Sequence, residues 1–173
     1  MKKTFFVPLL ALVLAAGVLL GLSFGLQDKA TELSQADHQA LMEMLLPGST
    51  EFVRQTGQLP EGILSAHKAA EGFVVEVSTQ GYADEIRMLV GVTNAGTVTG
   101  LTVLDAHETW GLGGKILTDH EFLSQYLNTY DADSVDAITG ATVTSKAVSR
   151  CVDTAVAYVT GADIESGATS WGG

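Results

Sequence analysis

The hydrophobic pattern of the chain begins with one long apolar run. Residues 4–26 contain no charged side chain, and a helix needs about 20 apolar residues to cross a bilayer. The run is also longer than the apolar core of a signal peptide. We therefore predict a retained transmembrane anchor over residues 1–27. The alternative is a cleaved signal peptide, because Gly21-Leu22-Ser23 has the small-x-small form of a cleavage site.

A second, shorter helix is predicted after the anchor. Apolar residues recur at helical spacing over residues 37–46, and Pro47-Gly48 ends the pattern. Residues 49–70 show little periodicity, so they are expected to be irregular. Residues 28–70 are accordingly interpreted as a juxtamembrane helix and a connecting segment.

Three runs beyond residue 70 have the composition and alternation of β-strands. They cover residues 73–77, 86–92 and 98–104. Turn-forming residues at 94–96 separate the last two runs. The pattern therefore predicts an antiparallel meander of three strands.

Two helices are predicted after these strands. Thr118 or Asp119 is suited to cap the first, and its expected buried residues are Phe122, Leu123, Tyr126 and Leu127. Thr144 or Ser145 is expected to open the second, which ends at Gly161. Its apolar stripe consists of Val148, Cys151, Val152, Ala155, Val156 and Val159.

The remaining segments are predicted to be loops around one domain. Residues 107–115 are rich in glycine, and residues 131–142 form a loop or a short strand. We therefore predict an α+β domain over residues 71–162, with a mainly antiparallel sheet packed by helices. The tail over residues 163–173 is rich in glycine and serine and is expected to be flexible.

The charge distribution orients this domain and excludes one class of partner. Lys2 and Lys3 precede the apolar run, which by the positive-inside rule leaves the N-terminus in the cytoplasm and the domain outside the cell. The whole chain has nine Lys and Arg against twenty Asp and Glu. Such an acidic domain is repelled by phosphate backbones, so we predict no nucleic-acid partner.

A glycine stripe within the apolar run indicates helix packing. Gly17, Gly21 and Gly25 fall on one helical face, where another membrane helix can approach closely. Other membrane subunits are therefore expected partners. Glycine is also simply common in membrane helices, which is the alternative explanation.

Several familiar chemistries lack their motifs. Cys151 is the single cysteine, so no internal disulfide or thiolate metal cluster is possible, and we expect it to be a small core residue. His107-Glu108 has no second histidine four residues on, and Gly113-Gly114-Lys115 lacks the P-loop spacing. No metal site and no hydrolytic residue is predicted.

One short string directly before the last helix has unusual chemistry. In the sequence Asp-Ala-Ile-Thr-Gly-Ala-Thr at residues 136–142, the small side chains of Gly140 and Ala141 leave the hydroxyl of Thr142 accessible. The backbone N–H groups and dipole of the following helix would stabilise a phosphate there. A simple helix start is the plainer interpretation.

This string resembles the flavinylation motif Asp-x-x-Ser/Thr-Gly-Ala-Thr of the FMN-binding domain family. That family includes the G subunit of the Rnf electron-transport complex and the C subunit of the sodium-pumping quinone reductase. The resemblance implies that FMN is joined as a phosphoester to Thr142 by a separate flavin transferase. It implies FMN contacts for the matching Asp136, Thr139, Gly140 and Ala141, and for Thr144 and Ser145 at the helix start.

A second segment, residues 107–115, resembles the family's His-x-Glu-Thr-Pro-Gly-Leu-Gly loop, which lies against the flavin. It differs by one residue fewer before Glu108 and by Trp110 in place of proline. The resemblance implies FMN contacts for His107, Glu108, Thr109, Gly111, Leu112, Gly113 and Lys115, and for Tyr82, which follows a glycine as in the family.

A second copy of the motif occurs at residues 163–169 and ends in Thr169. Only Ser170-Trp171-Gly172-Gly173 follows it, which is too short for a helix, so Thr142 is the predicted acceptor. The resemblance then implies an electron-carrier subunit of a membrane complex that couples ferredoxin and NAD to sodium or proton movement. The alternatives are a free-standing extracytoplasmic flavoprotein shuttle and a non-redox scaffold or assembly protein.

Overall fold

A computed structural model describes residues 37–108, 113–129 and 132–162 of the 173-residue chain. The chain divides into two compact units, residues 1–40 and residues 41–173. Within the described ranges, no helix is both long enough and apolar enough to cross a membrane. The predicted span over residues 4–26 and the predicted flexible tail lie outside them.

The second unit is built on one five-stranded antiparallel sheet in which each strand pairs with the next along the chain. The strands are β1 (Val53–Arg54), β2 (Ile63–Lys68), β3 (Gly72–Gln80), β4 (Glu85–Thr93) and β5 (Val98–Ala106). The three predicted strands correspond to β3, β4 and β5. The antiparallel meander is therefore confirmed, and each strand is longer than its apolar run.

The prediction that residues 49–70 are irregular is wrong, because β1 and β2 lie within them. In β2 the register shifts between Ile63 and Ser65, which places Leu64 at the surface and buries the small residues Ser65 and Ala66. The bulge interrupts the alternation of apolar and polar residues that identifies a strand in sequence. The sheet thus begins before residue 71.

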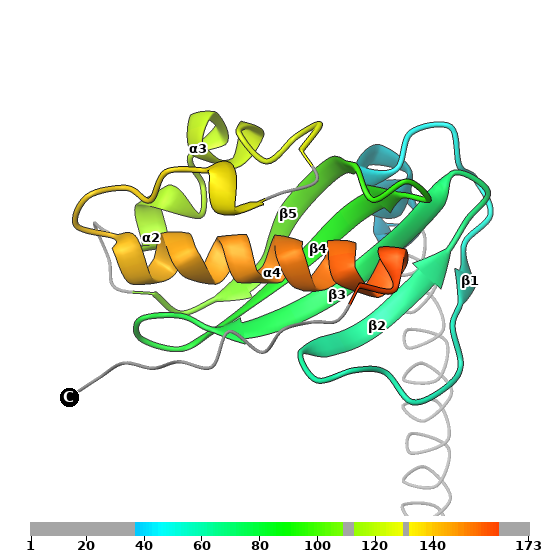
Figure 1. Cartoon of the computed structure of the whole chain (residues 1–173), viewed down its shortest axis with the longest axis horizontal. Coiled ribbons are helices and arrows are strands. Elements are labelled where there is room, and N and C mark those ends of the chain that lie inside the picture. Colours follow the sequence, from blue (N-terminus) through cyan, green and yellow to red (C-terminus); the bar gives the residue numbers. More distant parts are fainter. Residues whose placement is uncertain (1–36, 109–112, 130–131, 163–173) are drawn as a thin grey trace, which may run out of the picture. The chain divides into compact units, whose positions relative to one another are not determined.

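The helix α4 (Thr142–Thr160) lies across one face of the sheet, against β3 and β4 (Figure 1). Its predicted apolar stripe is confirmed: four members are fully buried, and Val156 and Val159 pack at the margin. The helix ends at Gly161, whose φ of 69° is the left-handed conformation that favours glycine. The buried stripe of α4 consists of Val148, Cys151, Val152 and Ala155.

The other face of the sheet receives the end of the first described helix, over residues 37–45, as predicted. The backbone of Leu45 comes so close that a Cβ on Gly91 would collide with the Leu45 carbonyl group, and a Cβ on Gly100 would lie 2.8 Å from the Leu45 Cα. The hydroxyl of Thr99 donates a hydrogen bond to the Leu45 carbonyl oxygen at 2.6 Å. A small second core forms here from Met42, Leu45, Leu46, Ala69, Val74 and Leu89.

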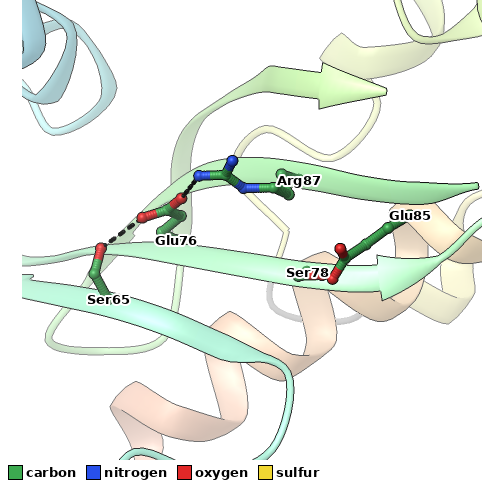
Figure 2. A network of polar contacts seen from close by, with 5 residues as sticks. All are labelled: Ser65, Glu76, Ser78, Glu85 and Arg87. Carbon is green, nitrogen blue, oxygen red and sulfur yellow. Dashed lines mark hydrogen bonds and ion pairs between the residues drawn. The ribbon is translucent and has the colours of Figure 1, made fainter. Parts of the chain in front are cut away.

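A group of polar side chains also lies on this second face (Figure 2). Arg87 forms an ion pair with Glu76, which also accepts a hydrogen bond of 2.9 Å from Ser65, and Ser78 donates to Glu85. The hydrogen bond to Glu76 raises the pKa of Arg87. Both carboxylates therefore have partners within the sheet.

In the described part of the chain between β5 and α4 there are two short helices and a 3-10 turn. They are α2 (Gly113–Ile116), α3 (His120–Ser124) and η1 (Ala132–Ser134). The cap of α3 by Asp119 is confirmed, since its carboxylate accepts hydrogen bonds from the N–H groups of Glu121 and Phe122. Residues 113–115 are helical rather than part of the predicted loop, and Leu127, predicted to be buried, is 39% exposed because α3 ends before it.

The burial of Cys151 predicts a loss of stability at alkaline pH. The side chain is fully buried, and burial raises the pKa of its thiol from 9.0 to about 12. The protonated thiol is therefore favoured by folding, and stability is lost as the pH rises from 9 toward 12. Between about pH 8 and about pH 10.5 we expect a loss of about 2 kcal/mol in urea-unfolding free energy from this group.

The matched variant for this measurement is Cys151→Ala. Burial also raises the pKa of Tyr126, so the variant should still lose some stability in alkali, but less than the natural chain by the contribution of the thiol. Equal losses in the two proteins would contradict the assignment.

Candidate functional site

The predicted acceptor, Thr142, is exposed and is the first residue of α4. The prediction that the helix opens at Thr144 or Ser145 is therefore wrong by two to three residues. The cap residue is Ala141, which has no side chain able to bind the N–H groups of the first turn. An exposed hydroxyl thus stands at a helix start that lacks a side-chain cap.

A tight turn before the helix presents this hydroxyl. The N–H of Ala141 donates to the carbonyl oxygen of Ile138 at 2.9 Å, and the intervening Gly140 has a φ of 88°. A hydrogen-bonded turn with positive φ at its third residue is typical of type II and requires glycine there. Thr139 and Asp136 are exposed on this segment. The glycine of the motif is therefore explained by its backbone conformation.

Ser145 holds that turn against the helix from the inside. Its hydroxyl donates to the carbonyl oxygen of Ala141 at 3.0 Å and accepts from the N–H of Ile138 at 3.1 Å. The side chain is buried. Ser145 was predicted to contact the cofactor, but its hydroxyl is committed to the protein. In the structure it sets the shape of the loop that carries Thr142.

Thr144 is similarly buried, and its hydroxyl donates to Oε2 of Glu108 at 2.8 Å. The other carboxylate oxygen of Glu108 accepts from the backbone N–H groups of Tyr82, at 2.9 Å, and Ala83, at 3.2 Å. The structure thus joins residues from the β3–β4 turn, the segment after β5 and the first turn of α4. Tyr82, Glu108 and Thr144 were all predicted to be part of one site.

A cleft of about 950 Å³ lies beside this cluster, between the end of β5 and the helices α2 and α3. Two of the site residues predicted from the sequence, Glu108 and Lys115, line this cleft. The other lining residues are Thr102, Val103, Leu104, Asp105, Ala106, Gly114, Leu117, Thr118, His120 and Leu123. Sequence reasoning placed Gly114 in the glycine-rich loop but did not identify the others as site residues, because only the folding of β5 against α2 and α3 brings them together.

The remaining predicted site residues separate into two groups. His107 is exposed, with its Nδ1 3.7 Å from a carboxylate oxygen of Asp105. Thr109, Gly111 and Leu112 lie outside the described residues. Among the residues that the structure describes, no group of three or more His, Cys, Asp or Glu side chains is arranged to hold a metal ion.

Comparison with known proteins matches this part of the chain to a family. Residues 81–157 match the FMN-binding domain. A protein of Methanosarcina acetivorans, named as the G subunit of an ion-translocating oxidoreductase complex, is 31% identical over 88% of this chain and 92% of that protein. The chain belongs to the G-subunit family of ion-translocating oxidoreductase complexes.

Two further members of this family are similar over shorter stretches. The G subunit of the Na⁺-translocating ferredoxin:NAD⁺ oxidoreductase complex of Acetobacterium woodii is 32% identical over 49% of this chain and 47% of that protein. The G subunit of the proton-translocating ferredoxin:NAD⁺ oxidoreductase complex of Clostridium ljungdahlii is 29% identical over 69% of this chain and 70% of that protein.

The matched FMN-binding domain begins at the turn held by Glu108 and ends within α4. It therefore contains the whole candidate site, whereas β1, β2 and β3 lie before it. In FMN a ribityl chain joins a large planar ring to a phosphate, and the site offers one feature for the ring and one for the phosphate. The helix start at Thr142 lacks a side-chain cap and suits the phosphate, and the cleft is large enough for a planar ring system.

Proposed function

We propose that this chain is the membrane-anchored, FMN-carrying electron-transfer subunit of an Rnf-type ferredoxin:NAD ion-translocating complex. FMN is joined to it as a phosphoester on Thr142. The observation that carries the linkage is the exposed hydroxyl of Thr142 at the start of a 19-residue helix without a side-chain cap. Membership of the G-subunit family supports the place in the complex.

The first turn of α4 would bind the phosphate of the tethered cofactor. The first backbone hydrogen bond of the helix start runs from the N–H of Ser145 to the carbonyl oxygen of Ala141. The N–H groups of Thr142, Val143 and Thr144 precede it, and they point toward the helix N-terminus, as the first N–H groups of any helix do. An anion esterified to the first residue therefore completes the cap and is favoured by the helix dipole.

The covalent bond removes the need for a deep binding pocket. A tethered ring samples the neighbouring cleft at high effective concentration, so modest contacts there suffice to orient it. When bound, FMN supplies one- and two-electron redox chemistry, and the protein supplies its position and surroundings. The side chains of this site therefore act by holding the cofactor, and none is assigned a role as acid or base.

The predicted anchor places this domain at the membrane where ion translocation takes place. The basic residues Lys2 and Lys3 before residues 4–26 favour an extracytoplasmic position for the domain. A flavin transferase working on that side would attach the cofactor. The glycine face of Gly17, Gly21 and Gly25 supports packing against other membrane subunits.

Peptide mass mapping of the protein purified from its own membranes tests the proposal. We expect the peptide containing Thr142 to carry the mass of one FMN less one water, and the peptide containing Thr169 to be unmodified. We also expect other membrane subunits to co-purify. Flavin on Thr169 alone would overturn the acceptor assignment, and a modified chain that purifies without other subunits would favour a free-standing shuttle.

A further inference from the structure

The carboxylate of Glu108 sits at the junction of three chain segments. Oε1 accepts hydrogen bonds from the N–H groups of Tyr82 and Ala83, and Oε2 accepts one from the hydroxyl of Thr144. An ionised carboxylate can only accept hydrogen bonds, and these three donors occupy both of its oxygens. The side chain is half-buried, so it is held by the protein rather than directed into solvent.

Two glycines provide the space for this carboxylate. A Cβ on Gly81 would collide with Oε1 of Glu108. A Cβ on Gly113 would lie 2.6 Å from Oε2 and 2.6 Å from the hydroxyl oxygen of Thr144. Neither glycine is among the described residues with a positive φ, so backbone conformation does not explain them. Glycine at position 113 therefore leaves room for Glu108 and its partner Thr144, and glycine at position 81 leaves room for Glu108 together with the Asp84 carbonyl oxygen and the Ile86 side chain, each of which would lie 2.8 Å from a Cβ there.

We propose that Glu108 is a positioning residue that fixes the start of α4, and with it the hydroxyl of Thr142, against the β3–β4 turn and α2. Thr144 lies only two residues after Thr142, within the same helical turn. The hydrogen bond between Thr144 and Glu108 therefore also sets the direction of the first N–H groups of the helix and the position of the acceptor hydroxyl. This inference rests on the proposed function in one respect, that Thr142 is the acceptor.

The main competing role for Glu108 is electrostatic, since its negative charge near the flavin would lower the reduction potential. The two roles differ in what glutamine can replace. In Glu108→Gln the amide oxygen can still accept from Tyr82 and Ala83, and the amide nitrogen can donate to the hydroxyl oxygen of Thr144. The shape and all three bonds survive while the charge is lost, so glutamine rescues a positioning role and not an electrostatic one.

The first measurement is amide hydrogen exchange on the full-length chain in detergent, purified from cells without flavin transferase. In Glu108→Ala we expect exchange at Tyr82 and Ala83 to quicken by about tenfold, the size expected from losing hydrogen bonds to a charged acceptor. Glu108→Gln should stay within about twofold of the natural chain. The control is Glu121→Ala, an exposed carboxylate on α3. Unchanged exchange in Glu108→Ala would overturn the positioning role.

The second measurement is the initial rate of FMN attachment to Thr142 by a flavin transferase, followed by the midpoint potential of the attached flavin. We expect Glu108→Ala to attach FMN at least about tenfold more slowly and Glu108→Gln to match the natural rate and potential. The inference would be overturned if Glu108→Gln attached FMN as slowly as Glu108→Ala. It would also be overturned if the midpoint potential of the flavin in Glu108→Gln were shifted as far as in Glu108→Ala. Absence of FMN from the natural chain is a failure of the proposed function instead, and the exchange result still decides the role of Glu108.

Gly113→Ala supplies an independent route to the same contact. The added methyl group would displace the Glu108 carboxylate from Thr144, so the variant should slow attachment in the way that Glu108→Ala does. If the two act through one contact, the double variant should be no slower than the slower single variant. If the double variant slowed FMN attachment by the product of the two single-variant factors, the two residues would have separate roles, and the inference would be contradicted.

Discussion

Replacing Thr142 by alanine should abolish covalent FMN while leaving the domain folded. The side chain is exposed, and no residue of the core depends on it, so the free energy of unfolding should change by less than about 1 kcal/mol. The loss of flavin should be complete, because an ester needs the hydroxyl oxygen as its bridging atom. The measurements are the intact mass of the chain, flavin fluorescence after denaturing electrophoresis and urea unfolding.

Two variants make this result specific. Thr142→Ser keeps a hydroxyl at the same place and should retain covalent flavin. Thr169→Ala removes the hydroxyl of the second motif copy and should leave flavin content unchanged. Covalent flavin that persists in Thr142→Ala and disappears in Thr169→Ala would move the acceptor to the tail.

The parts of the fold with strong periodicity were predictable from the sequence. The strands β3, β4 and β5 are rich in β-branched residues, and α4 has an apolar stripe at helical spacing that is buried as expected. The strand β2 was missed because its bulge and its small buried residues Ser65 and Ala66 produce no alternation. A strand of that kind is recognised only through its pairing with β3.

The candidate site was predictable in its composition but not in its geometry. The sequence predicted an accessible hydroxyl at Thr142, and the residue is exposed; Gly140 was singled out for its small size, whereas the structure adds that its φ of 88° favours glycine. Local reasoning could not show that Thr144 and Ser145 face the interior, because their partners are set by a carboxylate 36 residues away and by a turn that folds back on the helix.

The cleft and the role of Glu108 depend on long-range packing. The sequence places Glu108 beside a glycine-rich segment, which suggested contact between glycine backbone and flavin. The structure shows that Gly81 and Gly113 border the carboxylate itself. Because residues 81, 108 and 113 meet only after β4, β5 and α2 have assembled, a single sequence gives the residue types without the contact.

A second large effect is expected on stability from Gly91→Ala. In the natural chain Gly91 lets the backbone of Leu45 lie directly on the sheet, and an added Cβ would collide with the Leu45 carbonyl group. The obstacle is backbone, which cannot rotate away as a side chain can. The segment would have to lift from the sheet and expose part of a core containing Met42, Leu45 and Leu46. We expect a loss of about 3 kcal/mol in the free energy of unfolding, measured by urea titration.

Two control variants separate this collision from other effects of substitution. Gly57→Ala adds the same methyl group where a Cβ would meet nothing within 4 Å, so its effect should stay within about 0.5 kcal/mol. Thr99→Val removes only the hydrogen bond to the Leu45 carbonyl oxygen and should cost about 1 kcal/mol. If Gly91→Ala were as mild as Gly57→Ala, the close packing of residues 41–46 on the sheet would not contribute to stability. We expect the loss in unfolding free energy to be largest for Gly91→Ala, smaller for Thr99→Val and smallest for Gly57→Ala. This order follows only if the packing of residues 41–46 on the sheet holds the segment in place.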